Sequence, residues 1–149
     1  MPDTNIVQNV NKAIKFLLEK DRNLLENDSS ERSITHKLAC YLEKYFPEWD
    51  IDCEYNRNLI DTKKLKDTCK NSSEENGSSV FPDIIIHKRM STKNYIVIEV
   101  KKTTNKEKDE CDIQKLEAFR KELGYRHGLF LRFRTGSTDV KVETCEWIY

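Results

Sequence analysis

Two short stretches of sequence decide the fold, Val80-Phe81-Pro82-Asp83-Ile84-Ile85-Ile86 and Tyr95-Ile96-Val97-Ile98-Glu99-Val100-Lys101. Both are dominated by β-branched residues, which is typical of buried strands. The residues between them are mostly polar and include Ser91 and Thr92, as expected for a hairpin connection. The sequence therefore predicts two neighbouring strands that carry charged residues among apolar ones.

Strand geometry predicts where these charges point. Successive side chains of a strand alternate between faces, so Glu99 and Lys101 should share one face with Val97. Asp83 can face them from the neighbouring strand. An Asp, a Glu and a Lys that meet at one end of a sheet form a site suited to a divalent cation, because Mg²⁺ prefers carboxylate oxygens.

A charged residue inside an apolar strand is costly unless it is paired or binds an ion. This cost favours a functional role for Asp83 and Glu99 over the alternative that they are ordinary solvated acids at strand ends. Lys101 has an alternative, since it can form a salt bridge with Glu99 or simply belong to a basic strand end. Parity separates Lys101 from Lys102, which should point to the opposite face.

The pattern resembles the PD-(D/E)xK phosphodiesterase superfamily, whose members have the restriction-endonuclease-like fold. The resemblance covers approximately residues 29–134. It rests on Pro82-Asp83, on the triplet Glu99-Val100-Lys101, and on Glu31 near the start of a preceding predicted helix. It implies a metal-dependent nuclease, with DNA a better candidate substrate than RNA.

The resemblance also implies roles for these residues. Asp83, Glu99 and Glu31 would hold Mg²⁺ or Mn²⁺, and Lys101 would assist the attacking water, so all four are candidate catalytic residues. Glu31 has a structural alternative. The spacing of Asp28-Ser29-Ser30-Glu31 matches a capping box, in which the Glu31 carboxylate would accept a hydrogen bond from the backbone amide of Asp28.

The order of predicted elements indicates an α/β protein with a central mixed sheet of four to five strands flanked by helices. Helical spacing of apolar residues predicts one amphipathic helix or a broken pair over 4–26, and a second helix over about 30–46. The other expected elements are a strand at 49–57, the two strands already described, a helix that ends at Gly124, a strand at 128–133 and an edge strand at 140–147.

The chain is predicted to form one nuclease-like domain over residues 1–149. We expect an N-terminal helical extension at 1–28, a core at 29–134 and a C-terminal edge strand at 135–149. Within the core, residues 58–79 are strongly polar and predict a mobile loop or insertion.

Net charge is zero, which argues against a protein that coats nucleic acid through bulk electrostatics. Charge is nevertheless uneven, because residues 84–108 include seven Lys or Arg but only two Glu. This region favours local contact with phosphate, although a solvated basic face is an equally good explanation. Our candidate nucleic-acid contacts are Lys102, Arg57, Gln114 and Lys115. Gln114 and Lys115 are expected on the same exposed side of the helix that ends at Gly124.

We expect nucleic acid as the partner, and no membrane, because no apolar stretch approaches the roughly 20 residues of a membrane span. A signal-peptide pattern is also lacking, so a cytoplasmic location is predicted. The N-terminal helix can pack on the core or form a homodimer. Two other functions stay open, a non-catalytic nucleic-acid-binding or regulatory module that keeps the nuclease fold, and a protein-interaction domain.

Overall fold

The computed structural model describes residues 2–55 and 81–149. It contains four helices and five strands among these residues. They are α1 (Thr4–Lys20), α2 (Arg22–Glu26), α3 (Glu31–Tyr45), β1 (Asp50–Cys53), β2 (Ile84–His87), β3 (Asn94–Lys102), α4 (Asp109–Leu123), β4 (His127–Arg134) and β5 (Lys141–Ile148). The expected insertion at 58–79 and the candidate contact Arg57 lie outside the described residues.

The five strands form one mixed sheet in the order β1-β2-β3-β4-β5. Adjacent strands are antiparallel except β3 and β4, which run parallel and are connected through α4. Such a parallel pair needs a crossover connection, which the helix supplies. The α/β class, the mixed sheet with flanking helices and the C-terminal edge strand are therefore confirmed.

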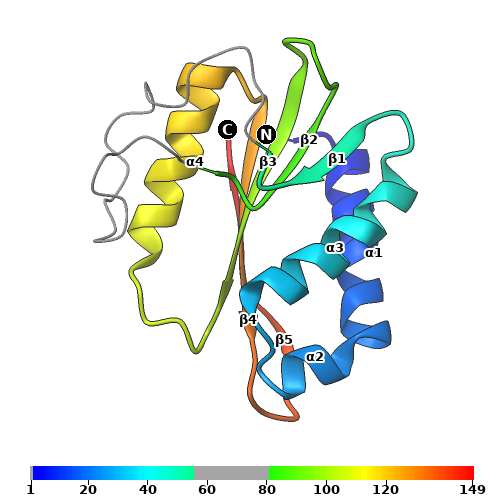
Figure 1. The fold of residues 1–149 in the computed structure, drawn as a ribbon, viewed down its shortest axis with the longest axis vertical. Helices are drawn as coiled ribbons and strands as arrows, with labels where there is room; N and C mark the ends of the chain where they lie inside the picture. The colour runs from blue at the N-terminus through cyan, green and yellow to red at the C-terminus, as the bar shows by residue number, and fades with distance from the viewer. Residues whose placement is uncertain (1, 56–80) are drawn as a thin grey trace.

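Helices cover both faces of the sheet. In Figure 1 the sheet is seen nearly edge-on, with α4 on one side and α1, α2 and α3 on the other. One apolar core joins α1 and α3 to Ile96, Ile98 and Val100 of β3. A smaller core joins α4 to Val97 and to Phe130 of β4. The alternation predicted for β3 is thus confirmed, and β3 is buried on both faces.

The N-terminal segment is the predicted broken pair of helices. Its apolar residues, among them Val10, Ala13 and Leu17, are buried in the same core as α3. This face of α1 is therefore covered within the chain. No helix among residues 2–55 and 81–149 combines the length and the apolar character needed to cross a membrane.

The end of α4 shows why local sequence predicted it well. Gly124 has a left-handed backbone, with φ of 74°, and its amide donates to the carbonyl of Arg120. Residues with a side chain rarely adopt this conformation, whereas glycine adopts it freely. The preceding turn carries Arg120 and Lys121, whose positive charge suits the C-terminal end of a helix.

We predict that Gly124→Ala lowers the free energy of unfolding by about 1–2 kcal/mol, the usual cost of a left-handed conformation for a residue with a Cβ. A Cβ at this position would meet nothing within 4 Å, so the change isolates the backbone effect. Urea unfolding measures it. Gly124→Asn is the matched control and should lose less, because Asn tolerates this conformation. Equal losses in the two variants would show that the backbone conformation is not the cause.

Candidate functional site

Asp83 and Glu99 are joined where β2 begins, beside the C-terminal half of β3. The backbone amide of Asp83 donates to Glu99 Oε2 at 2.9 Å. In return, the backbone amide of Val100 donates to Asp83 Oδ2 at 2.8 Å. The Glu99 carboxylate therefore accepts from the amide of Asp83, and the Asp83 carboxylate accepts from the amide of the residue after Glu99. This reciprocal pair fixes the two acids next to each other.

The environment opposes the negative charge of both acids. Glu99 is only 3% exposed, and burial raises the pKa of its carboxyl. Asp83 is half-buried, and burial together with the charge of Glu99 raises the pKa of its carboxyl well above the usual range. Lys115 acts in the opposite direction on both groups. When both carboxyls are ionised, the single nearby ammonium leaves an excess of negative charge.

The ammonium that contacts Glu99 belongs to α4. Lys115 Nζ lies 2.9 Å from Glu99 Oε1. The prediction that Lys115 lies on the same exposed side of the helix as Gln114 is wrong. Gln114 is exposed, whereas Lys115 is turned inward toward β3.

Lys101 lies on the same face of β3 but has other partners. Its Nζ is 2.9 Å from Asp112 Oδ2 and 3.6 Å from Asp109 Oδ1, both on α4. Arg132 of β4 also pairs with Asp109. The alternative of a salt bridge between Lys101 and Glu99 is wrong, because the ammonium of Lys101 pairs with these aspartates.

Glu31 ties the start of α3 to the end of β3. Its Oε2 accepts from the Lys102 amide at 3.0 Å and from Asn105 Nδ2 at 2.9 Å. Helix α3 is instead capped by Ser30, whose hydroxyl accepts from the Ser33 amide. The capping-box alternative is therefore wrong.

A second tie lies next to Glu31. Lys102 Nζ is 3.2 Å from Asp28 Oδ1, and the same carboxylate accepts from Thr104 and Thr135. Hydrogen bonds from these hydroxyls, with a contribution from Lys102, lower the pKa of the Asp28 carboxyl. Lys102 thus has an anionic partner within the chain, and its contact with nucleic acid stays a prediction.

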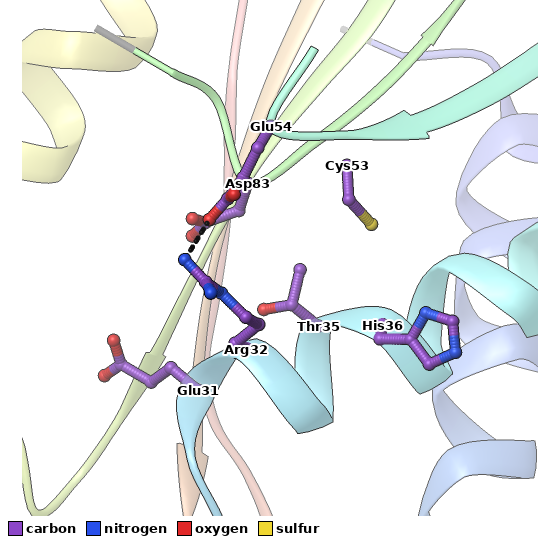
Figure 2. A pocket seen from close by; sticks show the side chains of 7 residues that line it. All are labelled: Glu31, Arg32, Thr35, His36, Cys53, Glu54 and Asp83. Carbon is purple, nitrogen blue, oxygen red and sulfur yellow. Dashed lines mark hydrogen bonds and ion pairs between the residues drawn. The ribbon is translucent and has the colours of Figure 1, made fainter.

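A pocket of about 540 Å³ opens between the start of α3, the end of β1 and the start of β2. Figure 2 shows its seven lining residues, Glu31, Arg32, Thr35, His36, Cys53, Glu54 and Asp83. Arg32 reaches toward β1, where its guanidinium lies 3.3 Å from Glu54 Oε1, and its side chain is 82% exposed. The pocket therefore presents Asp83 together with one largely solvated guanidinium.

The carboxylates of the site suit a cation that needs few protein ligands. Across residues 2–55 and 81–149, no three or more His, Cys, Asp or Glu side chains are grouped so as to hold a metal ion. Mg²⁺, however, keeps several waters and requires only one or two carboxylates from the protein. The adjacent pair of Asp83 and Glu99 meets that requirement. Glu31 is engaged by Lys102 and Asn105 and is not part of the pair.

Sequence reasoning missed Asp109, Asp112 and Asn105 as partners of site residues. A signal for Asp109 and Asp112 was present, because these two residues and Lys115 follow one another at intervals of three positions, and such residues share one face of a helix. That face opposes the charged face of β3. Asn105 lies in the turn after β3 and had no comparable pattern.

Comparison with known proteins adds no relative. No protein-family model, no curated protein and no solved structure matches this chain.

We predict that Asp83→Asn stabilises the fold at neutral pH by on the order of 1 kcal/mol. The raised pKa means that ionisation of Asp83 is less favourable in the folded than in the unfolded chain. The penalty is absent below the unfolded pKa of about 3.9, grows as pH rises from that value toward the folded pKa, and is constant above the folded pKa. The gain should therefore appear at about pH 7 and vanish near about pH 3.5.

Urea unfolding at these two pH values measures the effect. Glu48→Gln, which removes an exposed carboxylate, is the control and should change stability little at either pH. A loss of stability in Asp83→Asn at neutral pH would show that the charge of Asp83 is compensated in the folded protein.

Proposed function

We propose that this protein is a metal-dependent nuclease of the restriction-endonuclease-like fold. The observation that carries the proposal is the reciprocal pair of Asp83 and Glu99, two carboxylates fixed together in surroundings that oppose their charge. A divalent cation would relieve this excess. The element order α3-β1-β2-β3-α4-β4, helix, three strands, helix and strand, supports the proposed fold.

In this proposal Asp83 and Glu99 hold Mg²⁺ or Mn²⁺. Such a cation supplies Lewis-acid polarisation of a phosphoryl oxygen and lowers the pKa of bound water. Glu31 has a supporting role, because its hydrogen bonds fix the start of α3 against the end of β3 and so shape the pocket beside Asp83.

The proposed substrate is a nucleic-acid phosphodiester, with DNA preferred on the family resemblance. Arg32 is well placed to contact an anionic phosphate, because it is largely solvated and lines the same pocket as Asp83. A guanidinium suits this task, since it can donate two parallel hydrogen bonds to phosphate oxygens.

One observation favours a second candidate, a non-catalytic nucleic-acid-binding or regulatory module. Lys101, the lysine of the Glu-x-Lys triplet, is engaged by Asp112 and Asp109. A binding module that keeps the fold would tolerate the pairing of Lys101 with these aspartates. A nuclease that uses this lysine needs the ammonium near its reacting phosphate.

The proposal predicts Mg²⁺- or Mn²⁺-dependent cleavage that is lost in Asp83→Asn and Glu99→Gln by about 100-fold or more, the scale of removing a group that acts in the transition state. The assay follows nicking of supercoiled plasmid and cleavage of single-stranded DNA and RNA, with EDTA as the metal-free reference. Glu43→Gln, an exposed change on α3, is the matched control and should retain activity.

Wild-type protein that binds nucleic acid but cleaves none of these substrates would favour the binding module. Cleavage that persists in both Asp83→Asn and Glu99→Gln would reject the site.

A further inference from the structure

We infer that Lys115 of α4, and not Lys101 of the Glu-x-Lys triplet, is the catalytic lysine of this site. In the metal-free protein it neutralises Glu99, and in the enzyme it donates to an anionic oxygen of the phosphodiester. The inference rests on the proposed function and specifies which lysine contacts the substrate of the proposed nuclease.

Among the described residues, Lys115 makes the only side-chain ion pair with Asp83 or Glu99. Its Nζ is 2.9 Å from Glu99 Oε1, and Glu99 Oε2 is occupied by the amide of Asp83. The Lys115 side chain is 21% exposed, compared with 3% for Glu99. Its ammonium therefore contacts the buried acid while the side chain keeps some access to solvent, which a substrate-contacting group requires.

Lys101 has neither property. Its side chain is only 3% exposed, and its ammonium is shared between Asp112 and Asp109. Releasing it would leave two aspartates on α4 without this partner, and breaking a buried pair is strongly unfavourable. The contacts instead suit a structural role, in which Lys101 holds the first turns of α4 against β3.

The chemistry of a lysine side chain explains how Lys115 can pair with Glu99 in the metal-free protein and contact the phosphodiester in the enzyme. A cation bound to Glu99 competes with Lys115 for the carboxylate, and an ammonium on a flexible four-carbon chain can move without backbone change. The charge freed in this way lies at the same acids, where it can stabilise negative charge that develops on a phosphoryl oxygen. Lysine supplies three donors for that purpose.

The first test compares Mn²⁺ affinity at fixed neutral pH in wild-type protein, Lys115→Met and Lys101→Met. Loss of a competing cation should tighten Mn²⁺ binding of Lys115→Met by about threefold or more. Lys101→Met should change affinity less than Lys115→Met. Unchanged affinity in Lys115→Met, or a larger increase in Lys101→Met, would overturn the inference.

The second test measures cleavage with the same proteins. Lys115→Met should lower kcat by about 100-fold with little change in KM, because the contact is made mainly in the transition state. Lys115→Arg should recover part of kcat, which a purely structural loss would not explain. Lys101→Met should lose at least tenfold less than Lys115→Met.

Thermal unfolding establishes that each variant is folded. If Lys101→Met does not fold, Asp112→Asn replaces it, since this change removes the negative charge that pairs with Lys101 at 2.9 Å and leaves the Glu99 side chain in place. Cleavage lost through Lys101 or Asp112 but kept in Lys115→Met would overturn the inference and leave the nuclease intact. Wild-type protein without Mn²⁺ binding or cleavage would overturn the proposed function, and the inference with it.

Discussion

The structure depends on the neutralisation of charges that are buried on β3. Glu99 and Lys101 are almost fully buried on the face covered by α4. Burying a charge is tolerated only when it is paired and hydrogen-bonded. Helix α4 supplies both partners, Lys115 for Glu99 and Asp112 for Lys101. Shifting α4 along the strand would separate both pairs, so these charges restrict how the helix can pack.

The end of β3 is fixed a second time, by residues that precede and begin α3. Glu31 binds the amide of Lys102, and Asp28 binds the ammonium of Lys102. Segments from both sides of the sheet therefore meet at one end of one strand. Asp83 lies close to this junction and lines the pocket, while its charge is opposed by its surroundings. In the proposed nuclease this arrangement would sacrifice some stability for a metal ligand, as is common where activity and stability compete.

Much of the architecture was predictable from local patterns. Apolar spacing predicted α1, α2, α3 and α4, and β-branched runs predicted β2 and β3. Gly124 marked the end of α4, because a left-handed cap is a property of the backbone that glycine reveals directly. The exclusion of a Glu31 capping box was not predictable. Ser30 and Asp28 are both suitable N-cap residues. Only the position of β3 shows that the Glu31 carboxylate accepts instead from the amide of Lys102.

The sequence by itself determined which residues share a face, because alternation in a strand and the period of a helix are local geometry. It placed Glu99 and Lys101 on one side of β3 and apolar residues on the other. The tertiary structure alone decided which lysine meets which carboxylate. That choice depends on the rotation and height of α4 over the sheet, which are set by packing of Leu116, Phe119 and Leu123 against residues distant in the chain. Local periodicity contains no information about that docking, so the partner of Glu99 could be found only in three dimensions.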